Sequence, residues 1–375
     1  MDFSLSEEQS LLKDSIGKYI ANDYDFRARQ TTAQTELGYS GAHWAQLADL
    51  GWLSIPFSDD IGGYGGQIED TAILCEEFGK GLVLEPFLPT VLLAGKLLEA
   101  MGRNDLVQSI IEGTAHCALA ALERHSRQNF SDIQTTARRQ NDGFVLHGEK
   151  TLVLRGGSAD TLVVSARSSG ERGDEDGISL FVVDANVSGI TKSTIPTMDG
   201  GRVANIAFDN VTVTNDALMG ELGKGWSALS NVIQQARIAT CAEAVGIMDT
   251  LSTKTVEYTK TRTQFGTPIG SFQALQHRMV DMLMAAEQSR SILYRAICEY
   301  QQDDPSASAT IAAMKALVGK NGRYVGEEAI QLHGGMGMTD ELDIGHYVKR
   351  LMVLNHLFGD ADNCVQEFSD ITYAA

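Results

Sequence analysis

The stretch Arg262-Thr-Gln-Phe-Gly-Thr-Pro-Ile-Gly-Ser-Phe-Gln273 separates two long segments of helical composition, and the rest of the chain is organised around it. Gly266 tolerates positive φ and Pro268 cannot continue a helical hydrogen-bond ladder, so the first helix should end here. Arg262 stands just before this stop, and its planar guanidinium suits a phosphate or a carboxylate. A stretch of this kind on its own is most often an ordinary corner between helices. A second glycine-rich corner, Gln331-Leu-His-Gly-Gly-Met-Gly-Met338, favours a functional interpretation of both.

Composition limits the classes of function. The chain has 375 residues and a formal net charge of -19, which argues against a nucleic-acid or anionic-membrane surface. Its five cysteines form no C-x-x-C pair, a pattern typical of reduced thiols rather than of disulfides or a zinc site. We find no basic leader followed by an apolar core, and no run of roughly 18 apolar residues that would predict a membrane span. The expectation is a cytoplasmic protein without a metal site.

The N-terminal third is predicted to be helical. Ser6 and Gln9 form a capping-box signature ahead of apolar residues at helical spacing. The pattern changes near Cys117, where short segments rich in Val, Ile, Leu and Thr alternate with polar turns. The predicted strands are Cys117–Leu122, Gly143–Leu154, Thr161–Ala166, Ile178–Asp184 and Ala204–Val213.

The C-terminal part is helical again and predicts a four-helix bundle. Its long helices are expected over Ser227–Lys260, Phe272–Gln301, residues 305 to about 333, and Glu341–Phe358. The fold class is therefore α+β with three domains, a helical domain at 1–115, a β-barrel or sandwich at 116–220 and a helical bundle at 221–375.

This order of domains, together with the two glycine-bearing motifs, closely resembles the acyl-CoA dehydrogenase family along the whole chain. Smaller stretches match as well, namely L-V-L-E-P-F-L at 82–88, C-A-E-A-V-G at 241–246 and L-F-G-D-A-D at 357–362. Within the family, the resemblance is strongest to heteromeric members that act on pimeloyl-CoA or on steroid side chains. The resemblance implies an FAD-dependent oxidoreductase of β-oxidation that acts on an acyl-CoA, with electron transfer flavoprotein as electron acceptor. In such an enzyme a carboxylate removes the α-proton while the β-hydrogen leaves as hydride to the flavin.

The resemblance also assigns cofactor-binding residues, because the family binds FAD across a subunit interface. Arg262 should reach the pyrophosphate of the FAD in a neighbouring subunit. The other expected contacts line the adenosine side or lie against the dinucleotide: Gln264, Phe265, Gln273, Gln331, Gly334 and Gly335. The alternative is that the aromatic and aliphatic residues pack the corner and the glycines only cap helices.

The catalytic base is where the sequence departs from the family. Family members carry a glutamate either before the glycine that aligns with Gly359 or on the long helix before an arginine, and these positions hold Phe358 and Ala236. Glu243 is the candidate substitute, but it lies about 10 Å further along the same helix face. We therefore favour a structural or pocket-shaping role for Glu243 over that of catalytic base.

The predicted β-domain departs too. Where relatives have a threonine-, proline- and glycine-bearing stretch that contacts the flavin ring, this chain has Leu122-Glu-Arg-His-Ser-Arg-Gln-Asn-Phe130. Ser126 could donate one hydrogen bond, and the arginines make the loop basic, which suits either CoA phosphates or an exposed turn. The segment Gly148–Arg155 lacks the tryptophan that relatives place beside the flavin.

The chain thus keeps what a neighbouring subunit contributes to the FAD and has lost much of what the host subunit contributes. The leading hypothesis is the small subunit of an α2β2 heterotetramer, whose partner acyl-CoA dehydrogenase chain carries the base. The alternatives are a homotetramer that uses Glu243, and a non-catalytic acyl-CoA-binding scaffold.

Overall fold

The computed structural model describes residues 5–373 and divides them into two compact units. Unit 1 comprises residues 5–30, 68–83 and 237–373, and unit 2 comprises residues 31–67 and 84–236. Helices α2 (Phe26–Ala33) and α7 (Trp226–Thr261) begin in one unit and continue into the other.

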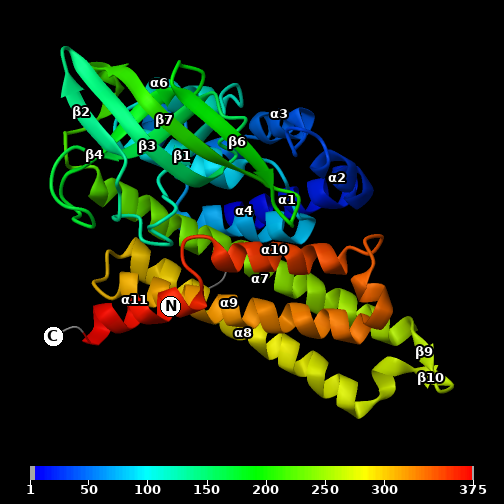
Figure 1. The fold of residues 1–375 in the computed structure, drawn as a ribbon. Coiled ribbons are helices and arrows are strands. Elements are labelled where there is room, and N and C mark those ends of the chain that lie inside the picture. Colours follow the sequence, from blue (N-terminus) through cyan, green and yellow to red (C-terminus); the bar gives the residue numbers. More distant parts are fainter. Residues whose placement is uncertain (1–4, 374–375) are drawn as a thin grey trace. The chain divides into compact units, whose positions relative to one another are not determined.

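Unit 2 is built on an eight-stranded sheet in the order β6-β7-β3-β2-β4-β5-β8, with β1 pairing in parallel with β4 (Figure 1). The strands are β1 (Cys117–Ala120), β2 (Thr136–Gln140), β3 (Gly143–Leu154), β4 (Thr161–Arg167), β5 (Ile178–Asp184), β6 (Ile190–Pro196), β7 (Arg202–Thr214) and β8 (Leu218–Met219). The remaining helices of this unit are α3 (Gly41–Asp49), α5 (Lys96–Ala100) and α6 (Asn104–Ile111), with a π-helical stretch at Phe87–Gly95.

The sheet encloses an apolar core, to which β1, β4 and β5 contribute because they are buried along most of their length. Phe144 and Phe181 meet edge to face with their ring centroids 5.2 Å apart in this core. A two-residue turn joins β2 to β3, with Gln140 paired to Gly143 and Asn141 at φ 51°. The Asn-Asp-Gly signal in the sequence predicts this turn because asparagine tolerates the left-handed conformation.

Unit 1 is helical and carries one small hairpin (Figure 1). Its central helix, α9, packs against α8, α10 and α11. The elements are α1 (Glu7–Asp23), α4 (Ile68–Gly81), β9 (Thr263–Gln264), β10 (Thr267–Pro268), α8 (Gln273–Gln301), α9 (Ala307–His333), α10 (Ile344–His356) and α11 (Ala361–Tyr373). The predicted capping box of α1 is present, since Gln9 N donates to Ser6 Oγ at 3.1 Å.

Two glycines bring α4 and α7 into direct backbone contact. A Cβ at Gly79 would lie 2.3 Å from the Glu243 carbonyl oxygen, and one at Gly246 would lie 2.0 Å from that of Glu76. Any side chain at either position would push the helices apart. Arg290 of α8 adds a charged link by pairing with Glu76 on α4 and Asp249 on α7.

The fold class is confirmed: helices, a sheet domain and a helical C-terminal region follow one another as predicted. Some elements escaped prediction, namely β2, the edge strand β6 and helix α11. The two strands are polar and partly exposed, so their sequences lack the apolar alternation that marks a half-buried strand. Within the N-terminal region predicted to be helical, residues Phe87–Gly95 are π-helical rather than α-helical, and α5 follows them directly. No helix among residues 5–373 is long and apolar enough to cross a membrane.

Candidate functional site

The stretch after α7 forms a hairpin rather than a plain corner, and it projects from the far end of α7 and α8 (Figure 1). Thr267 pairs with Gln264, and the two residues between them, Phe265 and Gly266, have φ values of 54° and 79°. Two successive left-handed residues define the tight turn whose twist matches that of a hairpin. The glycine was predicted from the sequence, but the left-handed phenylalanine was not.

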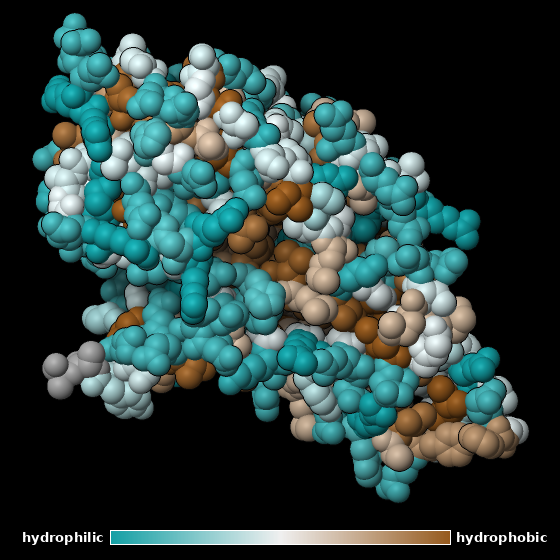
Figure 2. All heavy atoms as spheres, viewed as in Figure 1, coloured by the Kyte–Doolittle hydropathy of each residue, from teal (hydrophilic) through white to brown (hydrophobic). Residues whose placement is uncertain are grey.

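The hairpin presents an exposed arginine and an exposed aromatic ring, and that ring, Phe265, meets Phe272 edge to face with the centroids 6.2 Å apart. Arg262 is exposed, and within residues 5–373 its guanidinium forms no ion pair, while its backbone N–H donates to Tyr258 O at 2.8 Å. Phe265 at the tip is 94% exposed. Figure 2 shows apolar residues gathered on the surface at this end of unit 1, at the lower right of the view. A free guanidinium beside an exposed ring suits a negatively charged, flat ligand or a partner chain.

The second corner follows α9 and is open as well. Gly334 has φ 61° and ψ -139°, a conformation available to glycine alone. A Cβ added at Gly334 or Gly335 would meet no atom within 4 Å, so space lies in front of both residues. Behind the corner, a Cβ at Gly337 would lie 2.9 Å from Ile330 O. The loop is therefore packed on its inner side and bare on its outer side.

The remaining predicted cofactor residues are also exposed. Gln331 lies at the surface just before the glycine corner, and Gln273 at the start of α8. Gln264 is exposed in the hairpin, where its amide Nε2 donates to Thr263 O at 2.7 Å. Tyr258 connects the two corners: its ring stacks on His333, with the centroids 4.4 Å apart, one turn before Arg262.

The position where relatives carry a glutamate after the last long helix is apolar and closed. Phe358 is buried with φ 59°, and Gly359 follows at φ 108°. Arg237 holds this corner, since its Nε donates to Phe358 O at 2.8 Å while its two terminal nitrogens bind the Glu367 carboxylate at 2.7 Å each. The nearby carboxylate of Glu367 is therefore neutralised by an arginine.

Glu243 is similarly occupied. Arg350 of α10 donates two hydrogen bonds to its carboxylate, from Nε to Oε1 at 2.6 Å and from Nη2 to Oε2 at 2.8 Å. Glu243 is 9% exposed, so the pair lies largely out of water. Both oxygens of the Glu243 carboxylate are therefore hydrogen-bonded to the guanidinium of Arg350. Arg350 is 107 residues from Glu243 in the sequence, and no local signal predicts this pair.

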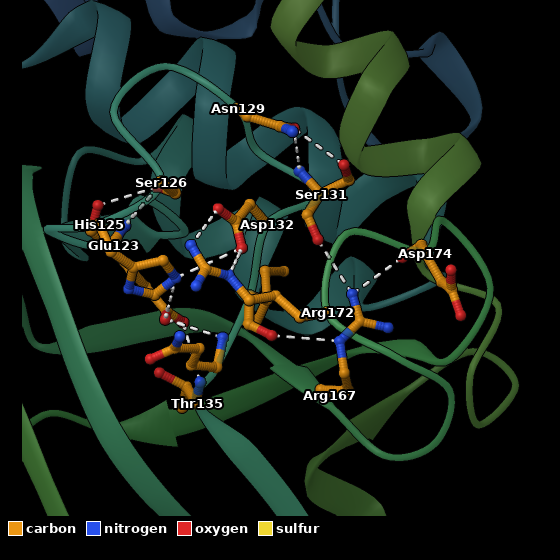
Figure 3. Close-up of polar contacts among 12 residues, drawn as sticks. Glu123, His125, Ser126, Asn129, Ser131, Asp132, Thr135, Arg167, Arg172 and Asp174 are labelled. Atoms are coloured by element: carbon orange, nitrogen blue, oxygen red, sulfur yellow. Dashed lines mark hydrogen bonds and ion pairs between the residues drawn. The ribbon is translucent and has the colours of Figure 1, made fainter.

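The loop of residues 122–135 in unit 2 is tightly bonded to its own domain (Figure 3). The Glu123 carboxylate accepts from Lys150 Nζ at 2.7 Å and from the backbone N–H groups of Gln134 and Thr135 at 2.8 and 3.0 Å. Burial alone would raise the pKa of Glu123, but Lys150 and the backbone donors outweigh it and hold that pKa below its usual range. Burial lowers the pKa of Lys150 to about 8 although Glu123 opposes the shift.

Two further polar groups of this loop, Ser126 and His125, also bond within unit 2. The Ser126 hydroxyl donates to Glu123 O at 2.9 Å and accepts from Glu123 N at 3.1 Å, so it is consumed within its own turn. His125 lies 3.4 Å from Asp132, which also pairs with Arg172 (Figure 3). Arg124 and Arg127 are exposed, whereas Leu152, in the segment that lacks tryptophan, is a half-exposed aliphatic residue at φ 52°. No group of His, Cys, Asp or Glu among residues 5–373 could hold a metal ion.

Models of one family match nearly the whole chain. The acyl-CoA dehydrogenase N-terminal domain matches residues 6–116, the middle domain residues 118–211 and the C-terminal domain residues 223–363. The chain belongs to the acyl-CoA dehydrogenase family. It is 29% identical to a short-chain-specific acyl-CoA dehydrogenase from Megasphaera elsdenii, over 93% of this chain and 94% of that protein. It is also 28% identical to an L-prolyl-[peptidyl-carrier protein] dehydrogenase from a Serratia species, over 98% and 97% of the two chains.

Solved acyl-CoA dehydrogenase-like structures agree. The FAD complex of PigA has a TM-score of 0.90 at 26% identity, covering 98% of both chains. Butyryl-CoA dehydrogenase from Megasphaera elsdenii has a TM-score of 0.88 at 25% identity with the same coverage. The predicted family and enzyme class, an oxidoreductase acting on acyl-CoA, are confirmed, as is FAD as the cofactor that goes with this family.

Proposed function

We propose that this chain is one subunit of an FAD-dependent acyl-thioester dehydrogenase and completes a flavin site housed mainly by a different chain. Its contribution is the pair of open corners in unit 1. The residues proposed to hold the cofactor are Arg262, Gln264, Phe265, Gln273, Gln331, Gly334 and Gly335.

The guanidinium of Arg262, which forms no ion pair within residues 5–373, carries the proposal. An exposed arginine that directly precedes the hairpin, at the same end of α7 as the bare glycine corner, fits a pyrophosphate. FAD, when bound, accepts the hydride from the β-carbon of the substrate. The residues of this chain would bind and orient the dinucleotide, with Arg262 countering its charge.

The host half of the site fits FAD poorly. The Ser126 hydroxyl, the candidate donor to the flavin ring, instead donates to the Glu123 carbonyl oxygen in its own turn. The buried Glu123–Lys150 ion pair holds the loop around it. This difference between the halves supports a second chain that supplies the flavin-ring pocket.

The same division is proposed for the base. Both family positions for the glutamate are apolar here, and the carboxylate of Glu243 is neutralised by Arg350. Removal of an acidic α-proton requires a free carboxylate within hydrogen-bond reach. We therefore place the base on the partner chain and give Glu243 a structural role. In the homotetramer alternative, the hydrogen bonds between Arg350 and Glu243 would have to break before Glu243 could remove the α-proton.

Two similarities support a heteromer and an electron acceptor. The solved Tcur3481-Tcur3483 steroid acyl-CoA dehydrogenase variant, named for two chains, has a TM-score of 0.88 at 25% identity. A structure described as the electron transferring flavoprotein of Acidaminococcus fermentans has a TM-score of 0.91, also at 25% identity. We propose the α2β2 assembly and electron transfer flavoprotein on this basis.

The carrier of the acyl group is open to a second candidate. Nearly equal identities to a short-chain acyl-CoA dehydrogenase and to an L-prolyl-[peptidyl-carrier protein] dehydrogenase make both a CoA thioester and a carrier-protein thioester chemically reasonable. The same α,β-dehydrogenation serves both. Parallel assays with acyl-CoA esters and with acyl groups loaded on a carrier protein separate the two.

The central experiment is to express the chain alone and together with the acyl-CoA dehydrogenase chain encoded beside it. Flavin absorbance and dehydrogenation of a series of acyl thioesters are then recorded for each preparation. We expect colourless protein alone and a yellow, active complex with the partner. Yellow and active protein from this chain alone would reject the heteromer, and Glu243→Gln would then test the base. A chain that never binds flavin or raises a partner's activity would indicate the scaffold.

Arg262→Met tests the cofactor contact in that complex. Loss of a charge-assisted contact of about 1.5–3 kcal/mol should raise the FAD dissociation constant roughly 10- to 100-fold, measured by quenching of flavin fluorescence. Arg323→Met is the matched control, because the Arg323 side chain is 74% exposed and pairs with Glu327 one turn further along its own helix. Equal FAD affinity in both variants would reject the role of Arg262.

A further inference from the structure

Two residues on one face of α7 contact the chain on either side of the glycine corner, one before the glycines and one after them. The Tyr258 hydroxyl donates to the carbonyl oxygen of His333 at 3.3 Å, and its ring stacks on the imidazole at an interplanar angle of 28°. Lys254, one turn earlier, pairs with Asp343 at 2.7 Å, just beyond the corner. Residues four apart on a helix share a face, so a single helical surface contacts the chain before and after the glycines.

His333 is a neutral, oriented platform for this contact. Its Nδ1 lies 2.8 Å from Ala329 O, and because a carbonyl only accepts, Nδ1 carries the proton. Burial lowers the pKa of His333, outweighing the opposing effects of that hydrogen bond and of Asp343. The ring therefore stays uncharged near neutral pH, and its orientation is set by both the hydrogen bond and the stack.

These contacts fix the peptide plane that enters the glycines. That plane contains the His333 carbonyl, which accepts from Tyr258, and the Gly334 N–H, which donates to Gln331 O. Both polar groups of this peptide are hydrogen-bonded, which restricts rotation of its plane, and the next peptide starts from the glycine-only conformation at φ 61° and ψ -139°. Tyr258 thus controls the direction of the bare outer surface at Gly334 and Gly335.

We infer that Tyr258 and Lys254 are positioning residues that preorganise the glycine corner for the FAD dinucleotide. The inference rests on the proposed function of that corner. Tyr258 also precedes Arg262 by one helical turn, and its backbone carbonyl oxygen accepts a hydrogen bond from the Arg262 backbone N–H. The same segment of α7 therefore positions both the Arg262 side chain and the exposed surface of the glycine corner. A corner already held in its bound shape loses less conformational freedom on binding, which favours affinity.

The test uses the flavin-binding assembly and measures two quantities for each variant: the FAD dissociation constant of the FAD-stripped assembly, and its melting temperature without FAD. Tyr258→Phe removes the hydroxyl and keeps the stack, Tyr258→Leu removes both, and Lys254→Met removes the ion pair. The matched controls are Tyr324→Phe on the surface of α9 and Lys260→Met, whose lysine is exposed and pairs with Glu257 on its own helix.

We expect the FAD dissociation constant to rise about tenfold in Tyr258→Leu, about threefold in Tyr258→Phe and about twofold in Lys254→Met, given the usual strengths of these contacts. The controls should match the wild type, and turnover at saturating FAD should return to the wild-type value in all variants. If Tyr258→Leu does not fold, Tyr258→Phe and Lys254→Met decide the matter.

The outcomes separate the two levels of the proposal. Melting temperatures that fall while FAD affinity stays at the wild-type value would make Tyr258 a structural residue and overturn the inference. If Arg262→Met still weakens FAD binding in that case, the proposed function stands. Unchanged FAD affinity in the Arg262 and Tyr258 variants together would overturn the proposed function and the inference with it.

Discussion

Two arginines of this protein show how the same side chain serves opposite purposes in its two units. Arg167 in unit 2 is buried, and its nitrogens donate to five backbone carbonyls, those of Ser131, Ile133, Ser169, Asp174 and Asp176. Arg262 in unit 1 is exposed, and its guanidinium forms no ion pair within the described part of the chain. The first arginine organises its own domain, whereas the second is available to a ligand.

The surrounding segments repeat the contrast. Residues 122–135 satisfy their carboxylate and serine hydroxyl internally, as Figure 3 shows. The glycine corner of unit 1 instead leaves open space in front of Gly334 and Gly335. A binding site for a ligand or a second chain is distinguished by polar groups that are not hydrogen-bonded within its own chain and by space that its own side chains leave empty.

The largest effect should come from breaking the closed region. Lys150→Met leaves the buried Glu123 carboxylate without its cation and should lower the free energy of unfolding by about 3–5 kcal/mol. Arg172→Met removes a half-exposed partner of Asp132 in the same network and should cost at most about 1 kcal/mol. Urea unfolding of both variants measures the difference. Similar small losses would show that the Glu123–Lys150 pair does not hold the loop.

The next effect contrasts two neighbouring residues of the open region. Gly334→Ala forces alanine into a glycine-only conformation and should cost about 1–3 kcal/mol of stability. Gly335→Ala places a methyl group in open space, so its stability should stay within about 0.5 kcal/mol of the wild type. FAD affinity should nevertheless fall in Gly335→Ala, because the methyl group occupies the proposed dinucleotide surface. An undiminished FAD affinity there would argue that this surface does not contact the cofactor.

The smallest effect for a single side chain is the change in stability when one buried histidine of either unit binds a proton. Burial lowers the pKa of His116 in unit 2 and of His333 and His346 in unit 1 below the ordinary value of 6.5. Below pH 6.5 the unfolded chain binds protons more readily than the folded chain does. The contribution of these histidines to the free energy of unfolding is therefore complete above pH 6.5 and decreases as the pH falls. The slope should approach about 1.4 kcal/mol per pH unit for each histidine.

Urea unfolding between pH 7.5 and 5.5 tests this dependence above the range where carboxylates titrate. His333→Phe should flatten the profile while retaining a ring against Tyr258, and the exposed His277→Phe should leave it unchanged. Stability that stayed constant over this range in the wild type would contradict neutral, buried histidines.

Much of the fold could be predicted because local patterns carry it. The capping box at Ser6, the turn at Asn141 and the long uninterrupted segment of α7 all follow from short-range preferences. Strands β2 and β6 escaped because Arg138, Arg139 and the polar residues of β6 reveal no buried face. Their pairing with β3 and β7 depends on partners elsewhere in the chain.

The sequence by itself determined the family, the order of domains and the two glycine-bearing corners, because motif spacing and residue type are written along the chain. The tertiary structure decided which polar groups are still available for chemistry. Arg350 neutralises Glu243 across 107 positions, Lys150 captures Glu123, and Tyr258 reaches His333 from another helix. Such pairings depend on distance in space and on exclusion of water, so only the folded chain reveals that the Arg262 guanidinium forms no ion pair with any of residues 5–373.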